Sequence, residues 1–416
     1  MIIGRENITR HEMKGEIARL TAEALSHLPL EKKRVLIIIP DATRHAELPL
    51  FFKTFFEILG KKVSALDYLI AAGTHQPMPL ENILQHVGIS VEEYRTTYSK
   101  TKFYNHVHDD TMHLKTIGTI SPSEMSQLSK GLYTLSVDIT VNSRIFQYDQ
   151  LILISPVVPH ETVGFSGGNK YFFPGIGGEE IIKTFHWIGA LITNPVVNGI
   201  MRTPVRDIID RSASLISVPR ICFAFVVEEH AVTSLFIGSP EESWQKAAEC
   251  SAKAHIRYVD RPYKKVLGLA PVIYDDLWVA GKVMYKHEPI IADGGEVIIY
   301  APHIKEISYT HGKEIRKVGY HTRDYFVKQW NRYSSVSKLI LAHSTNVRGI
   351  GTYENGIESP RIKVTLATSI PEDDCRSVNL GYADYRSIDI ADWKAKQNED
   401  LLVVENAGQL LYRLKN

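Results

Sequence analysis

The stretch RVLIIIPDATRHAELPLFFKTFFEILG, residues 34–60, decides the fold. Its first part, Arg34–Pro40, is an apolar run of strand length. Within residues 47–60, apolar side chains recur at helical spacing and a glycine ends the pattern. A second apolar run follows at 66–72 and a second amphipathic stretch at 80–88. This order of strand, loop, helix and strand predicts βαβ units, and therefore an α/β fold with mostly parallel sheets.

The same alternation continues along the chain and predicts two domains. Further strands are expected at 135–141, 151–155, 222–227, 232–237, 266–270, 296–300, 338–342 and 362–368, and further helices at 179–190, 241–254, 275–285 and 323–332. The alternation restarts after Arg261-Pro262. We therefore expect an N-terminal catalytic and cofactor-binding α/β domain at 1–260, with 391–416 packing back on it. A smaller C-terminal α/β domain at 261–390 would close a substrate cleft between the two.

Composition narrows the kind of ligand. The chain has 416 residues, with 48 Lys and Arg against 47 Asp and Glu, so its formal net charge is only +1. Such a balance argues against a nucleic-acid or anionic membrane partner. No run approaches the roughly 20 apolar residues of a membrane span. The three cysteines, Cys222, Cys250 and Cys375, are too few for a disulfide framework. We expect a cytoplasmic protein that acts on a small molecule, with its oligomeric state open.

Three of the expected strands end in polar residues. Asp41-Ala42-Thr43-Arg44 follows the first strand, Gly73-Thr74-His75 follows the second, and Pro159-His160 follows the run at 151–155. Ligands of open α/β sheets bind beyond the carboxyl ends of the strands. Each group alone has a structural explanation, such as a helix cap for the aspartate or a core position for a histidine. Three complementary groups at strand ends together indicate a binding site.

A glycine-rich loop, GFSGGNK at 164–170, follows the third strand end. It is not a Walker phosphate loop, because Asn169 precedes the lysine and Tyr171 follows it. Gly167 and Gly168 would still let backbone N–H groups approach an anion beside Lys170. His186 lies sixteen residues further on, within an expected helix, and no zinc-type spacing of ligands surrounds it. As a metal ligand it would need partners from outside the protein.

These motifs resemble those of the nickel-pincer lactate racemase family. The resemblance rests on DATR at 41–44, GTH at 73–75 and, above all, PHETVGFSGGNKYFFPGI with the later TFH, which places a histidine at 160, a lysine at 170 and a histidine at 186. It extends in order over most of the chain and includes Lys282 in LWVAGK, at 277–282.

The resemblance implies a cofactor and a set of site residues. The cofactor is a nickel-pincer nucleotide, nickel pyridinium-3,5-bisthiocarboxylic acid mononucleotide, attached covalently through Lys170, with His186 as the protein's nickel ligand. Two sulfurs, a carbon and an imidazole suit nickel better than zinc. The implied cofactor contacts are Asp41, Ala42, Thr43 and Arg44; the implied substrate contacts are Arg44, Trp278 and Lys282; and the implied acid/base pair is His75 and His160.

The implied reaction is inversion at C2 of a 2-hydroxy acid. One histidine removes the hydroxyl proton while the C2 hydride moves to the cofactor, and hydride return to the other face of the planar keto acid inverts the centre. This chain has Trp278-Val279 where the lactate enzyme has Tyr-Gln. We therefore expect a substrate larger or more polar than lactate, such as a sugar acid, with His303, Tyr309 and His311 as further candidate contacts.

Three alternatives remain at this point. The first is lactate racemase itself. The second is a metal-assisted hydrolase in which His75, His160 and His186 bind zinc directly. The third is a noncatalytic anion-binding protein on the same scaffold.

Overall fold

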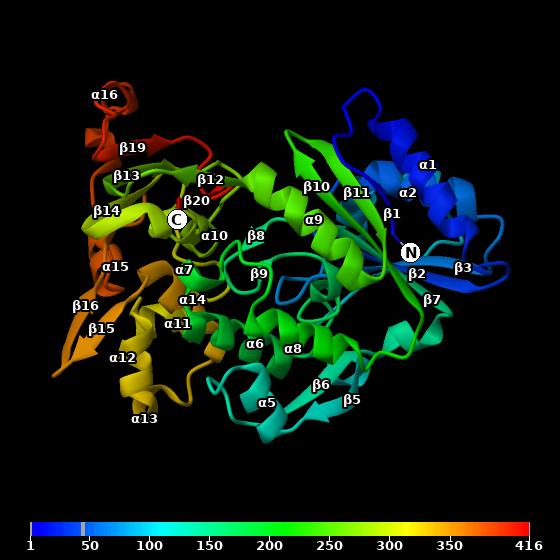
Figure 1. The fold of residues 1–416 in the computed structure, drawn as a ribbon, viewed down its shortest axis with the longest axis horizontal. Coiled ribbons are helices and arrows are strands. Elements are labelled where there is room, and N and C mark those ends of the chain that lie inside the picture. The colour runs from blue at the N-terminus through cyan, green and yellow to red at the C-terminus, as the bar shows by residue number, and fades with distance from the viewer. Residues whose placement is uncertain (1, 43–45, 416) are drawn as a thin grey trace. The chain divides into compact units, whose positions relative to one another are not determined.

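The computed structural model describes residues 2–42 and 46–415 and has a mixed α/β architecture (Figure 1). Its largest sheet has seven strands in the order β1-β11-β10-β7-β2-β3-β4. These strands are β1 (Ile3–Arg5), β11 (Ala231–Gly238), β10 (Arg220–Glu228), β7 (Gln150–Pro156), β2 (Arg34–Pro40), β3 (Ala65–Ala71) and β4 (Phe103–Asn105). From β10 to β4 every neighbouring pair is parallel, whereas β1, β11 and β10 pair antiparallel.

The central strands form because their sequences are apolar throughout. Every residue of β7 is buried, as is every residue of β2 after Arg34. Continuous apolar runs of this kind are typical of parallel strands covered on both faces. Helix α2 (Leu48–Leu59) contributes Phe51 and Phe55 to the core, where Phe51 lies 5.0 Å from Phe225 of β10 between ring centroids. The predicted unit of β2, α2 and β3 is confirmed.

The first 255 residues also contain a second, smaller sheet and several helices. The expected strand at 135–141 is β6 (Val137–Asn142), which pairs antiparallel with β5 (Leu114–Ile120) in a separate two-stranded sheet. The helices are α1 (Met13–Ser26), α3 (Leu80–His86), α4 (Val91–Thr96), α5 (Pro122–Leu128), α8 (Pro204–Ala213) and α9 (Pro240–His255).

A second sheet has five strands, all parallel, in the order β18-β17-β14-β13-β19. They are β18 (Gly381–Tyr382), β17 (Lys363–Thr368), β14 (Ile291–Ala301), β13 (Tyr263–Leu269) and β19 (Leu401–Val404). Its core also contains side chains of helix α10 (Leu277–His287). The smaller elements are α7 (Asn194–Val197), α11 (Gly312–Val318), α12 (Arg323–Lys328), α13 (Trp330–Tyr333), α15 (Glu372–Ser377), α16 (Ile390–Ala395), and the pairs β15 (Gly351–Glu354) with β16 (Ile357–Pro360) and β12 (Ile256–Val259) with β20 (Leu411–Leu414). The predicted α/β class with mostly parallel sheets is confirmed.

One predicted strand is wrong. Residues 338–342 form the start of helix α14 (Lys338–Arg348), in which every residue from Leu339 to Val347 is buried. A short apolar run does not by itself distinguish a buried strand from a buried helix, because both faces are covered in either case. The helix ends at Gly349, whose φ of 85° is the left-handed conformation that glycine adopts easily.

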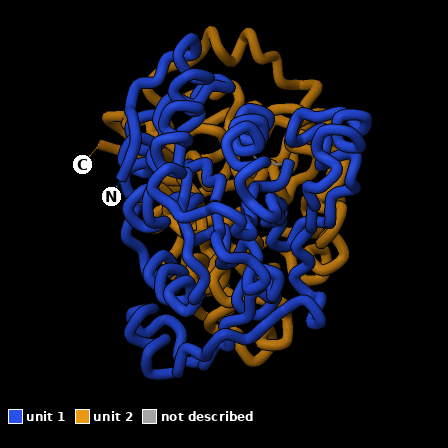
Figure 2. The backbone as a smooth tube through the Cα atoms, turned by 90° about the vertical axis from the view of Figure 1, so that its right-hand side faces the viewer, with its two compact units in different colours: residues 1–158, 165–182, 201–254 blue, residues 159–164, 183–200, 255–416 orange. Residues whose placement is uncertain are grey.

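The chain divides into two compact units at residues other than those expected (Figure 2). Unit 1 contains residues 1–158, 165–182 and 201–254, and unit 2 contains 159–164, 183–200 and 255–416. Within 391–416, β19 pairs with β13, whereas β20 pairs with β12 at 256–259, inside the range expected for the N-terminal domain; both pairs belong to unit 2. Among the described residues, no helix is long and apolar enough to cross a membrane.

Candidate active site

The structure brings together two of the predicted strand-end residues, Asp41 and His75. Strands β2 and β3 pair in parallel, with Pro40 opposite Ala71, so the residues that follow them leave the same edge of the sheet. The Nδ1 atom of His75 donates a hydrogen bond to Oδ2 of Asp41. The Asp41 side chain is 9% exposed and that of His75 is 51% exposed. The carboxylate therefore holds the proton on Nδ1 and leaves the lone pair on Nε2, the arrangement of a general base oriented by an acid.

The segment that carries Lys170 is bound to the same edge of unit 1. The backbone N–H of Gly73 donates to the carbonyl of Gly175 at 3.0 Å. Lys170 is half-buried and lies in the short 3-10 turn Gly168–Tyr171. The turn begins at Gly168 and is preceded by Gly167, and both glycines are at positive φ. Unit 1 thus places the His75 segment and the Lys170 segment in direct backbone contact.

The glycines of the loop are packed closely against other residues of unit 1, which leaves no open space for an anion beside them. A Cβ on Gly167 would lie 2.7 Å from the Ser155 side chain, and one on Gly168 would lie 2.9 Å from Cβ of Trp244. The N–H of Gly168 donates to Oγ of Ser155 at 2.7 Å. The expectation that this N–H meets an anion is therefore wrong, because a strand-end hydroxyl already accepts its hydrogen bond.

His160, the second predicted acid/base residue, belongs to unit 2 and is buried. Its Nδ1 accepts a hydrogen bond from the N–H of Thr162 at 3.1 Å, and Oε2 of Glu161 lies 3.5 Å from the same nitrogen. In the neutral ring the proton consequently sits on Nε2. His75 and His160 are thus held in opposite tautomers, one with a lone pair on Nε2 and the other with an N–H there. Their meeting in one site stays a prediction.

A buried lysine fixes the segment that carries His160. Lys286 of α10 is 4% exposed, and its Nζ donates to the carbonyl of Pro159 at 2.5 Å. An ammonium group taken out of water is stable only with such partners. Sequence reasoning missed Lys286, because a lysine near a helix end is normally solvated.

His186 lies on helix α6 (Glu179–Ile192), at a position in unit 2 where it is half-buried. Burial, together with the nearby His311 and His186, lowers the pKa of His343 to about 3, so these three histidines of unit 2 lie close enough to interact electrostatically. Over residues 2–42 and 46–415, no three His, Cys, Asp or Glu side chains are grouped as a ligand set for a metal ion. A metal bound at His186 would take its other ligands from a cofactor, which is the donor set that the resemblance implies.

Trp278 and Lys282 lie four residues apart on α10, one helical turn, and so on the same face. The Trp278 ring stacks on His343 with centroids 3.8 Å apart and planes at 19°, and it also contacts His311 at 4.5 Å. Nζ of Lys282 lies 5.1 Å from the ring centroid of Tyr274. An indole in contact with two imidazoles is restrained, so unit 2 holds the predicted substrate contact Trp278 in a defined position.

Other predicted residues have different surroundings. His303 bonds the carbonyl of Tyr274 through Nε2 at 3.0 Å, and Tyr309 is 67% exposed. Ala42 is exposed in the turn after β2. Thr43 and Arg44 lie outside the described residues. His343 was missed because residues 338–342 were expected to form a strand; the glycine at 349, a helix-ending signal, could have indicated α14.

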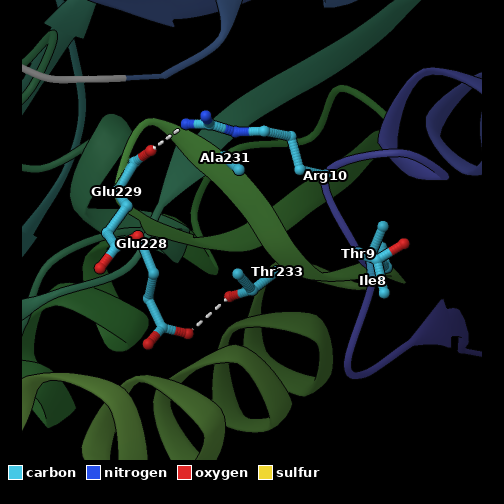
Figure 3. A pocket seen from close by; sticks show the side chains of 7 residues that line it. All are labelled: Ile8, Thr9, Arg10, Glu228, Glu229, Ala231 and Thr233. Atoms are coloured by element: carbon cyan, nitrogen blue, oxygen red, sulfur yellow. Dashed lines mark hydrogen bonds between the residues drawn. The ribbon is translucent and has the colours of Figure 1, made fainter.

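A surface pocket of unit 1 contains none of the predicted site residues (Figure 3). It lies at the turn between β10 and β11, where Arg10 donates to the carbonyl of Glu229 at 2.6 Å and Thr233 donates to Glu228 at 2.9 Å. Both contacts are exposed. We do not assign this pocket to the active site.

The fold is that of an α/β protein in which the predicted site residues Asp41 and His75 follow the carboxyl ends of parallel strands, where such proteins bind ligands. Comparison with known proteins agrees. Residues 10–197 match the family model described as the lactate racemase N-terminal domain. The curated lactate racemase of Thermoanaerobacterium thermosaccharolyticum is 25% identical over 322 residues, which cover 75% of this chain and 68% of that protein.

Two solved structures have the same fold. A crystal structure of a Thermotoga maritima protein is 33% identical with a TM-score of 0.87, and the match covers 99% of each chain. The lactate racemase apoprotein of Thermoanaerobacterium thermosaccharolyticum is 18% identical with a TM-score of 0.73, over 99% of this chain and 94% of that one. Residues 10–197 thus carry the lactate racemase N-terminal domain, the chain is similar to a lactate racemase over most of its length, and these likenesses support an isomerase.

Proposed function

We propose that this enzyme inverts C2 of a 2-hydroxy acid by reversible hydride transfer, and that its substrate is larger or more polar than lactate. The observation that carries the proposal is the Asp41–His75 pair, joined through Gly73 and Gly175 to the segment that contains Lys170. A base oriented by a carboxylate beside a lysine-bearing loop is what removal of a hydroxyl proton next to a tethered cofactor requires.

The residues present fit a nickel-pincer nucleotide. Lys170 would attach it, His186 would supply the protein's nickel ligand, and the DATR segment that begins at Asp41 would contact it. The absence of a three-ligand protein set among the described residues agrees with a metal held mainly by the cofactor's own sulfur and carbon atoms. When bound, the cofactor supplies the acceptor for the C2 hydride.

The protein's own part is to move protons on the substrate oxygen. In one direction His75 accepts the hydroxyl proton at Nε2, and Asp41 stabilises the imidazolium that forms. On protonation the Nδ1 of His160 stops accepting from the Thr162 N–H, and Glu161, 3.5 Å from that nitrogen, stabilises the charged ring, which gives a proton from Nε2 to the oxygen of the opposite enantiomer. The reverse reaction exchanges the two roles.

Substrate choice would depend on unit 2. Lys282 and Arg44 would bind the carboxylate and the C2 hydroxyl of any 2-hydroxy acid. The remainder of the substrate would face Trp278, which His343 and His311 hold in place. An aromatic wall edged with imidazoles suits a longer chain that carries hydroxyls, as in a sugar acid.

A panel of single-enantiomer 2-hydroxy acids tests this proposal. Cofactor-loaded protein is incubated with lactate, malate, phenyllactate and gluconate, and C2 configuration is followed by chiral separation. We expect faster inversion of the polyhydroxy acid than of lactate. Lactate as the best substrate would contradict the specificity while leaving the reaction intact. Zinc in the purified enzyme, with no visible chromophore and hydrolytic activity, would contradict the reaction itself.

A further inference from the structure

Three consecutive carbonyls of the glycine loop are bound by just two side chains. Arg206 of α8 donates to the carbonyl of Phe165 at 2.5 Å and to that of Gly167 at 3.2 Å. Trp244 of α9 donates from Nε1 to the carbonyl between them, that of Ser166, at 2.8 Å. All five residues belong to unit 1. The loop therefore has little freedom to rotate its peptide planes.

The two side chains also hold each other. The guanidinium carbon of Arg206 lies 4.0 Å from the ring centroid of Trp244, over the indole face. A cation over tryptophan is attracted by the ring's negative face, most strongly where water is excluded. Arg206 is 1% exposed and Trp244 is 2% exposed. Each planar group thus fixes the plane from which the other donates.

A guanidinium at this depth is costly. Burial lowers the pKa of Arg206 to about 10, against the ordinary 12.5. Its Nε has no hydrogen-bond partner among the described residues, and Nη1 and Nη2 donate to backbone carbonyls. A buried charge without a bidentate carboxylate is unfavourable for folding alone, where an apolar side chain of similar volume would pack as well. The buried arginine therefore serves to hold the glycine loop in one conformation.

Gly168 and Asn169 are held by the same two helices, so the restraint on the loop extends up to Lys170. Nδ2 of Asn169 donates to Asp210 at 3.0 Å and to Glu241 at 2.6 Å, again from α8 and α9. Gly168 is closed in by Trp244. Lys170 is therefore preceded by five residues, 165–169, whose backbone or side chains are fixed by two helices and the end of β7.

We propose that Arg206 and Trp244 are positioning residues that hold the glycine loop so that the Lys170 amine meets a thiocarboxylic carbon of the cofactor. A C–N bond would form there while a C–O bond breaks and water leaves, which gives a thioamide without any change of oxidation state. This inference rests on the proposed function, because it assumes attachment at Lys170. Neither residue touches substrate or cofactor; each acts through the backbone that presents the lysine.

The test compares loop order and attachment in the same variants. Arg206→Met removes both hydrogen bonds and the charge, Arg206→Lys keeps the charge without the planar fork, and Trp244→Phe keeps the ring without its N–H. The controls are Arg202→Met and Trp330→Phe, which change exposed residues of the same types. Full-length protein is produced with and without the cofactor-synthesis enzymes. Intact-protein mass gives the fraction of chains with an adduct, and hydrogen–deuterium exchange follows the amides of 164–170.

We expect about tenfold or more loss of adduct in Arg206→Met, since a misplacement of about 1 Å is enough to slow a positioned reaction severely. Trp244→Phe should lose less, and its melting temperature should remain near that of the wild type. Exchange of the Gly168 amide should accelerate in both variants without cofactor. The two controls should keep the wild-type adduct and exchange.

The two failures are distinguishable. Wild-type adduct levels in folded Arg206→Met and Trp244→Phe would overturn the positioning role and leave the proposed function standing. A wild-type protein with no adduct, from cells that make the cofactor, would overturn the attachment at Lys170 and the proposed function with it. If Arg206→Met does not fold, Trp244→Phe decides the positioning role.

Discussion

Substituting Gly168 with alanine should destabilise unit 1 more than an ordinary glycine-to-alanine substitution does. Gly168 has φ of 60°, where an L-residue costs about 1–2 kcal/mol. The added Cβ would also lie 2.9 Å from Cβ of Trp244 and 3.2 Å from the carbonyl of Pro240. Forcing a methyl group into such a packed site costs about 1–3 kcal/mol. We therefore expect Gly168→Ala to lower the free energy of unfolding by about 2–5 kcal/mol.

Gly131→Ala is the matched control, because Gly131 has φ of 82° and nothing lies within 4 Å of its added Cβ. It should lose only the conformational cost, about 1–2 kcal/mol. Equilibrium urea unfolding, followed by tryptophan fluorescence at fixed protein concentration, gives both values. Equal losses in the two variants would refute the close packing of Trp244 on the loop.

Asp41→Asn should lower kcat/KM by about tenfold to a hundredfold, since a hydrogen bond to a charged group contributes about 1.5–3 kcal/mol. Adding Asp41→Asn to His75→Ala should lower kcat/KM little further. A full additional loss in that double variant would show that the two residues act independently. His186→Ala should lose nickel, measured by metal analysis, while its melting temperature stays near that of the wild type; a variant that unfolds, with metal retained in its folded fraction, would make His186 a core residue. Burial lowers the pKa of His106 to about 4 from the ordinary 6.5, so the unfolded chain binds a proton before the folded chain does as the pH falls. The contribution of His106 to the free energy of unfolding should therefore be fully present above pH 6.5 and decline between pH 6.5 and 4. The urea midpoint of His106→Gln should fall less over that window than the wild-type midpoint does. An equal pH dependence in the two proteins would contradict the buried neutral ring.

The sequence predicted the first sheet well because its signals are local. A strand, a helix and a second strand are each predicted by a pattern within a few tens of residues: the run 34–40, the amphipathic stretch 47–60 and the next apolar run. The polar residues after β2 and β3 could be placed at one edge by topology alone, and the structure has Asp41 and His75 bonded there. Their pairing was not predicted, because each was assigned a separate role.

What the sequence did not predict depends on distant contacts. Residues 338–342 were mistaken for a strand because burial on all sides removes the amphipathic pattern that distinguishes a helix. Arg206 gives no signal in the sequence, since its acceptors lie about forty residues away on a loop. The boundary between the units at 182–183 likewise depends on tertiary contacts, because it falls inside a continuous helix, α6, where the local sequence gives no sign of it.

The most direct test of the central claim is the fate of deuterium at C2. Cofactor-loaded enzyme is given one enantiomer of its best 2-hydroxy acid, labelled with deuterium at C2, in ordinary water. Product of the opposite configuration is then isolated and its mass measured. Hydride transfer predicts that the inverted product keeps its deuterium, because the hydrogen at C2 never becomes a proton that exchanges with solvent. Inverted product that carries hydrogen from water would contradict the account.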